Sequence, residues 1–252
     1  MKHDNDTAAG VPERHPAAVR HFGPDRLPLI DRYAELLCTE GVVRGLIGPR
    51  EAPRIWDRHL LNSVLMAPAL PEGASVADIG SGAGLPGLVL AIARPDISMT
   101  LVEPLLRRTT FLEEVAAELG LDNVRVVRGR ADALHGKERF DVVTARAVSA
   151  LGTLLEWCLP LTEPSGALAV LKGESAADEI AAAAPILRRW GCAPPVVEVY
   201  ADEDESIVPA RLVRVTAADP TRVSWPPSGG RKPAAGGPGR GRSQHGYARR
   251  KK

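Results

Sequence analysis

The sequence is poor in cysteine and lacks long apolar runs. Its 252 residues include three cysteines, Cys38, Cys158 and Cys192, which are odd in number and too far apart for a disulfide framework or a CxxC zinc site. No stretch approaches the roughly 18 uncharged apolar residues that a membrane helix needs, and the first residues contain no apolar signal segment. We therefore expect a cytoplasmic protein that binds neither a metal nor a membrane, and we expect it to be a monomer.

Acidic residues are absent from the last part of the chain. Of the 32 Lys and Arg, nine follow Asp219, so residues 1–219 carry 23 basic against 31 acidic side chains, a net charge of −8. Gly and Pro are frequent in this last segment and apolar residues are few, which is typical of disorder. We expect residues 219–252 to form a disordered basic tail, which is either an arm that binds nucleic acid or a solvated appendage.

Between residues 71 and 218, apolar runs of strand length alternate with longer segments of helical period. This βαβ signature predicts an α/β fold, a parallel sheet covered by helices on both faces. We expect strands at 75–79, 98–102, 124–127, 140–145, 167–171, 196–200 and 211–215, and helices at 85–93, 106–119, 151–159 and 176–190.

The segment before the sheet has a different pattern. Residues 25–70 have helical periodicity at 27–37 and 55–66 without strand signals, which predicts an N-terminal helical layer packed on the sheet. Residues 1–24 contain three prolines and scattered polar groups, and we expect them to form a loose lead-in.

The most specific segment, residues 76–87, is a predicted strand that runs into a glycine-rich turn and then a helix. Gly80, Gly82 and Gly84 have no Cβ and tolerate positive φ, so a nucleotide-like ligand can lie directly on the backbone. Glu103 stands sixteen residues after this segment, at the end of the next predicted strand, where a carboxylate can accept both hydroxyls of a ribose. Strand, loop, helix, strand and acid in this order favour an adenosine-binding crevice over a structural glycine turn.

Two cofactor classes fit this crevice, because residues 82–87 also match the dinucleotide pattern GxGxxG. A dinucleotide would place its anionic pyrophosphate on the loop, where the carboxylate of Asp78 is unfavourable. S-adenosylmethionine has no phosphate and carries an ammonium and a sulfonium group, which suit a nearby acid. We therefore predict S-adenosylmethionine as the cofactor, with NAD or FAD as the alternative.

Five segments in this order resemble one family. They are DIGSGAGLPG at 78–87, RRTTFLEEVAAELGLDNV at 107–124, RAD at 130–132, TARAVS at 144–149 and VLKG at 170–173. Together they are similar to RsmG, also called GidB, the bacterial 16S ribosomal RNA guanine-N7 methyltransferases, over about residues 30–217. The resemblance implies a Rossmann-like class I S-adenosylmethionine-dependent methyltransferase sheet. It also implies methylation of a guanine in the 530-loop region of 16S rRNA, within the 30S subunit or its assembly intermediate.

The same resemblance assigns roles to individual residues. It implies cofactor binding by Gly80, Leu85, Glu103, Ala131, Asp132 and Arg146. The loop and its charge, as argued above, add Asp78, Gly82 and Gly84 to the residues that we expect to bind the cofactor. We expect Arg146 and Lys172 to be catalytic, and RNA to be bound by Arg58, His59, Arg130 and Lys172. Where many members have an Asn-Leu-Thr triplet, this chain has residues Gly45 to Ile47, which leaves the triplet's polar role without a counterpart.

The expected chemistry needs no general base, because N7 of guanine carries an in-plane lone pair and no proton at neutral pH. For each single basic residue, ordinary surface charge or an ion pair is the alternative to RNA contact. Two other functions stay open on the residues alone: a methyltransferase acting on a small molecule or protein, and an oxidoreductase, which Asp78 disfavours.

Overall fold

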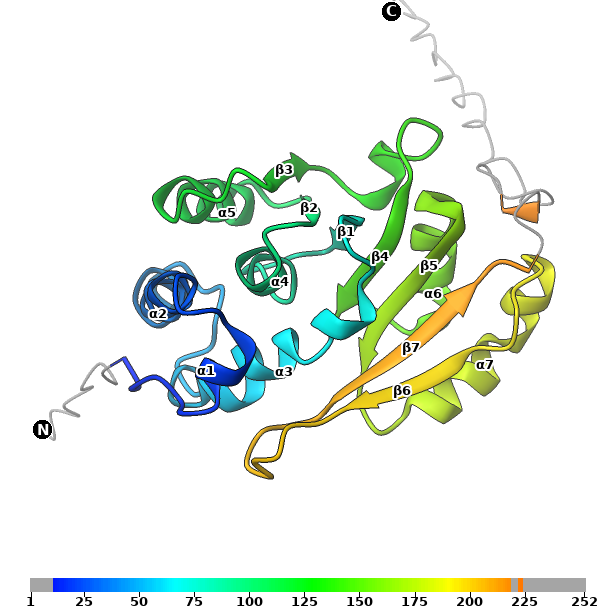
Figure 1. The fold of residues 1–252 in the computed structure, drawn as a ribbon. Helices are drawn as coiled ribbons and strands as arrows, with labels where there is room; N and C mark the ends of the chain where they lie inside the picture. The colour runs from blue at the N-terminus through cyan, green and yellow to red at the C-terminus, as the bar shows by residue number, and fades with distance from the viewer. Residues whose placement is uncertain (1–10, 219–221, 224–252) are drawn as a thin grey trace, which may run out of the picture.

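The structure is a computed structural model, and it describes residues 11–218 and 222–223. Its centre is a seven-stranded sheet in the order β3-β2-β1-β4-β5-β7-β6 (Figure 1). The strands are β1 (Ser75–Ile79), β2 (Ser98–Glu103), β3 (Val124–Arg128), β4 (Phe140–Arg146), β5 (Thr162–Lys172), β6 (Val196–Tyr200) and β7 (Ala210–Thr216). The tail expected at 219–252 lies outside the described residues, apart from Arg222 and Val223.

Helices cover both faces of the sheet (Figure 1). The main ones are α4 (Gly87–Ala93), α5 (Leu106–Glu118), α6 (Leu151–Cys158) and α7 (Ala176–Arg189). Helices α4 and α5 pack on β2, whereas α6 packs on β4 and β5 and against α7. The alternating apolar runs thus form one buried layer with a helical layer on each side.

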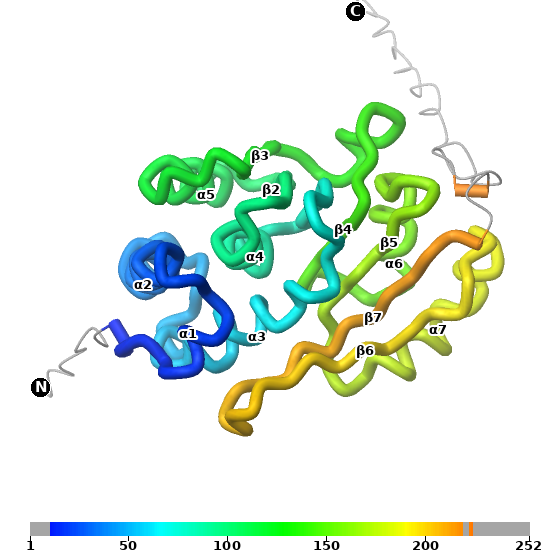
Figure 2. The backbone as a smooth tube through the Cα atoms, in the orientation of Figure 1, coloured from blue at the N-terminus to red at the C-terminus, as the bar shows by residue number. Residues whose placement is uncertain are grey.

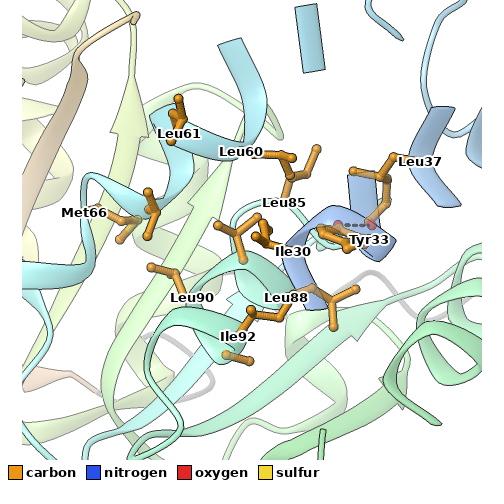
Figure 3. Packing of buried hydrophobic residues seen from close by; sticks show 14 of the residues in the cluster. Ile30, Tyr33, Leu37, Leu60, Leu61, Met66, Leu85, Leu88, Leu90 and Ile92 are labelled. Atoms are coloured by element: carbon orange, nitrogen blue, oxygen red, sulfur yellow. Dashed lines mark hydrogen bonds between the residues drawn. The ribbon is translucent and has the colours of Figure 1, made fainter. Parts of the chain in front are cut away.

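The N-terminal residues form a helical layer over α4. It consists of α1 (Ala18–His21), α2 (Leu27–Leu36), a π-helical turn at Leu37–Gly41, a second one at Ile55–Leu60 and α3 (Leu61–Val64). Figure 3 shows Ile30, Tyr33 and Leu37 from this layer packed near Leu85 and Leu88. These apolar contacts make the layer part of the same core as one face of the sheet, while α6 and α7 enclose a separate cluster on the other face.

The loop between β6 and β7, residues 201–209, reaches the N-terminal layer (Figure 2). The buried carboxylate of Asp202 accepts hydrogen bonds from Arg20 and His21. The side-chain amide of Asn62 donates to the carbonyl oxygens of Val208 and Pro209, at 3.0 and 3.1 Å. Segments from opposite ends of the chain therefore hold each other in place.

Three expectations need correction. The sheet is mixed, because β7 runs antiparallel to both β5 and β6, and residues 201–209 are too few for the crossover that a parallel pair requires. Helix α4 begins at Gly87 rather than at residue 85, since the preceding residues belong to the loop. The lead-in is not loose throughout, because α1 forms within it and Phe22 is 2% exposed.

Among the described residues, no helix is long and apolar enough to cross a membrane.

Candidate functional site

A cavity of 760 Å³ lies at the carboxyl ends of β1, β2, β3 and β4. The sheet order reverses between β1 and β4, and open α/β sheets bind ligands at such a switch point. Its walls come from the loops after these strands and from residues 46–48, 51 and 59 of the N-terminal layer. The volume lies within the usual range for small-molecule sites.

The glycine loop forms one wall of this cavity. Gly80 and Gly82 have positive φ values of 73° and 59°, which L side chains rarely adopt. A Cβ on Gly80 would lie 2.8 Å from a methyl group of Val148, whereas one on Gly82 would meet nothing closer than 3.9 Å. The loop thus presents bare backbone to the cavity, as a ligand lying flat on it requires.

Asp78 and Gly84 do not line the cavity, which corrects the expectation of direct ligand contact. Asp78 is fully buried beneath the loop, and its Oδ2 accepts a hydrogen bond from the backbone N–H of Gly87 at 3.1 Å. Burial raises the pKa of this carboxyl to about 7, and Oδ1 has no hydrogen-bond partner among the described residues. A Cβ on Gly84 would meet Leu88 and Tyr33 within 2.8 Å, so this glycine serves packing.

Glu103 ends β2 at the edge of the cavity and is 1% exposed. One carboxylate oxygen accepts from the N–H of Gly82 at 3.1 Å, and the other accepts from the N–H of Leu105 at 3.0 Å. Arg108 Nη1 donates at 3.4 Å to Oε2, the same oxygen that accepts from Gly82. The carboxylate is therefore fixed between the glycine loop and the loop after β2, where the sequence places it.

The loop after β3 closes the cavity beyond Glu103. Arg130, Ala131 and Asp132 all line it, and residues 131–133 form a short 3-10 helix. The side chain of Asp132 is exposed at the cavity, while Ala131 is buried. Leu85 lines the cavity as well, so the structure brings together most of the residues expected to hold the cofactor.

Arg146 ends β4 on the opposite wall. Its Nη1 donates to Ser63 Oγ at 3.4 Å, and its Nη2 lies 3.2 Å from Nδ1 of His59. Burial lowers the pKa of Arg146, and the charge of Asp78 acts in the opposite direction. The next residue, Ala147, has a φ of 54°, a strained conformation for a residue with a Cβ. Strain of this kind is concentrated at functional sites.

Lys172 and Arg58 lie outside the lining of the cavity. The ammonium of Lys172 donates to the carbonyl oxygen of Ser149 at 2.6 Å and pairs with Glu179 at 2.8 Å. Glu179 also accepts from the N–H of Leu151 at 2.8 Å. Lys172 therefore holds the loop that carries Ala147 and Val148. Arg58 is exposed and lies 3.7 Å from Glu51.

Comparisons with known proteins identify the family. The family GidB, described as rRNA small subunit methyltransferase G, matches residues 26–199. The chain belongs to this family. A ribosomal RNA small subunit methyltransferase G from Nocardioides sp. is 60% identical over 228 residues, which are 90% of this chain and 91% of that protein. The protein of the same name from Thermobifida fusca is 50% identical and covers 85% of this chain and 94% of its own length.

This membership confirms the family resemblance, and with it a methyltransferase that uses S-adenosylmethionine. Among solved structures, the mitomycin 7-O-methyltransferase MmcR gives a TM-score of 0.52 at 18% identity and covers 74% of this chain and 60% of that one. At this identity the likeness concerns the fold alone, and it confirms the Rossmann-like methyltransferase sheet expected from the sequence.

The structure adds residues that sequence reasoning did not find. Glu51, Arg108, His135 and Trp157 also line the cavity. Arg108 stands in the segment 107–124 but had no role assigned, and the other three residues lie outside the five segments. Among the described residues, no group of three or more His, Cys, Asp or Glu could hold a metal ion.

Proposed function

We propose that this chain transfers a methyl group from S-adenosylmethionine to N7 of a guanine in 16S rRNA, in the 530-loop region. The observation that carries the proposal is a single cavity with the glycine loop and Glu103 on one wall and Arg146 on the other, in a member of the GidB family. We further propose that the enzyme acts as a monomer on the 30S subunit or its assembly intermediate.

The residues at the cavity fit this cofactor. The bare backbone of residues 80–85 would carry its amino-acid part, the carboxylate of Glu103 would accept the ribose hydroxyls, and residues 131–132 would meet the adenine edge. In its ionised form, Asp78 would act from beneath the loop as a negative charge that favours a cationic ligand without touching it. When bound, S-adenosylmethionine supplies a methyl group on a positively charged sulfur.

The protein's own contribution to the reaction is alignment. N7 needs no deprotonation, so the site has to place its lone pair on the line through methyl carbon and sulfur, and orientation of this kind is worth up to about 7–11 kcal/mol. Arg146 faces the space next to the glycine loop, and a guanidinium can donate to O6, the acceptor beside N7 on the same base edge. We therefore assign Arg146 as the catalytic residue that orients the guanine.

RNA affinity has to come mainly from basic side chains. The chain has only ten aromatic residues, too few for a broad stacking platform, and extracting a base from its stack costs a few kcal/mol. Arg130 at the cavity rim and the exposed Arg58 are the groups we expect to contact phosphates. Lys172 acts as a positioning residue in this proposal, through the loop that it holds beside Arg146.

The test is transfer of a tritiated methyl group from S-adenosylmethionine to purified 30S subunits, followed by mapping of 7-methylguanosine through chain cleavage at that base. We expect label in one guanine of the 530-loop region and a large loss in Arg146→Ala. The matched control is Arg125→Ala, which removes an arginine paired with Glu138 outside the cavity and should transfer at the wild-type rate. Label on small acceptors or ribosomal proteins instead of rRNA would refute the proposal and support the second methyltransferase function.

A further inference from the structure

His59 connects two charged residues of the cavity wall. Its Nε2 lies 2.8 Å from a carboxylate oxygen of Glu51, and its Nδ1 lies 3.2 Å from Nη2 of Arg146. A guanidinium can only donate hydrogen bonds, so Nδ1 must carry a lone pair and Nε2 must carry the proton that is donated to Glu51. Both neighbours thus select the same neutral tautomer of the ring.

The two direct partners of the Arg146 guanidinium are both uncharged. They are the hydroxyl of Ser63, at 3.4 Å, and the imidazole of His59. Asp78 and Glu51 act on Arg146 through charge alone, since neither forms an ion pair with it within the described part of the chain. Because no carboxylate occupies its N–H groups, the guanidinium of Arg146 keeps hydrogen-bond donors available for a ligand. Its orientation then depends on its two remaining acceptors, Ser63 and His59.

We propose that His59, fixed in its Nε2–H form by Glu51, is a positioning residue that aims the Arg146 guanidinium at the incoming guanine. The proposal rests on the function proposed above. It gives His59 a role inside the enzyme rather than in RNA contact, and it gives Glu51 a role that no sequence motif indicates.

The contacts among Glu51, His59 and Arg146 should make the orientation of Arg146 sensitive to pH. The charged groups that face His59 are Glu51, Arg58 and Arg146, and burial together with the two arginines lowers the pKa of His59 below its usual value, against the opposite effect of Glu51. A proton on Nδ1 would remove the acceptor and set two cations against each other. Arg146 should therefore lose its orientation as the pH falls through the pKa of His59.

The experiment compares pH profiles of single-turnover methyl transfer to 30S subunits at saturating S-adenosylmethionine. His59→Ala should lower the rate about 10-fold to 100-fold, the usual effect of misplacing a reacting group. His59→Asn keeps an acceptor near the Nδ1 position and cannot titrate, so it should restore most of the rate and abolish the acid limb. Glu51→Gln should move that limb to lower pH, because the charge that raises the pKa of His59 is gone. His15→Asn, outside the cavity, is the matched control and should leave the profile unchanged.

A second readout does not depend on activity. The ring ¹⁵N shifts of His59 in the free protein should show the Nε2–H tautomer, with a titration midpoint that falls in Glu51→Gln and rises in Arg146→Gln. An Nδ1–H tautomer, or a midpoint that neither variant moves, would overturn the proposal. So would a His59→Asn variant as slow as His59→Ala. If wild-type protein methylates no rRNA, the proposed function fails, and the ring shifts still decide whether His59 holds Arg146.

Discussion

Asp78 should make the stability of this fold depend on pH in an unusual direction. Burial raises the pKa of its carboxyl from 3.8 to about 7, although the N–H of Gly87 and the hydroxyl of Ser81 favour the charged form. The folded state therefore binds a proton more tightly than the unfolded state. The stability that this proton contributes is fully present below pH 3.8 and is lost as the pH rises to about 7.

The size of the effect follows from the shift. One pKa unit corresponds to about 1.4 kcal/mol, so a shift of about three units corresponds to about 4 kcal/mol over the whole range. Between pH 5.5 and pH 8, where most other carboxylates stay ionised, roughly half of it, about 2 kcal/mol, should be lost. Asp78→Asn has the same shape and cannot ionise. The free energy of unfolding of the wild type should therefore fall by this amount more than that of the variant.

Urea unfolding followed by tryptophan fluorescence at both pH values measures this double difference. Comparing two proteins at each pH cancels the titration of every other group. Asp122→Asn, at an exposed position, is the matched control and should follow the wild type. If the free energies of unfolding of the wild type and Asp78→Asn change by the same amount between pH 5.5 and pH 8, the carboxyl is already ionised in the folded state. The reasoning from its burial would then be wrong.

Three further perturbations test the site and the tail. Glu103→Ala removes a carboxylate that faces the cavity and should weaken S-adenosylmethionine binding by about 1–3 kcal/mol in a calorimetric titration. Gly80→Ala forces a Cβ to within 2.8 Å of Val148 and should weaken the same binding, with partial recovery when Val148→Ala is added; equal affinities would contradict the described loop. Truncation after Asp219 removes nine basic residues, so filter binding should show weaker affinity for 30S subunits and a flatter dependence on salt. If the binding curves of the full and truncated chains superimpose across salt concentrations, the tail is a solvated appendage.

The strands could be predicted because each buried strand is a short apolar run bounded by polar turns. Strand β1, for example, spans the residues expected, Ser75–Ile79. The antiparallel direction of β7 could not be predicted from its apolar run, because parallel and antiparallel buried strands have the same pattern of apolar residues. The length of the connection at 201–209 contained the missing information, because a connection this short joins antiparallel neighbours.

The candidate site also contains residues whose positions could be predicted from the sequence and contacts that could not. Gly80, Gly82 and Glu103 stand in one local motif, and their positions at the cavity follow from strand, turn and strand in sequence order. The burial of Asp78 was not predictable, because an aspartate is rarely fully buried and the motif alone does not show that its carboxyl lies beneath the loop. The partners of Arg146 were not predictable either, since they lie more than 80 residues away in the sequence.

The N-terminal layer is therefore part of the site rather than a cover on the sheet. The hydroxyl of Tyr33 donates to the carbonyl oxygen of Ala83 at 2.7 Å, which ties α2 to the glycine loop. Ser63 and His59 supply the acceptors that Arg146 meets beyond the sheet. The loops at the carboxyl ends of the strands provide the backbone on which we expect the adenosine to lie. In the proposed reaction Arg146 meets the base, and its two direct partners, Ser63 and His59, come from this layer, so we expect the layer to contribute to specificity for a guanine.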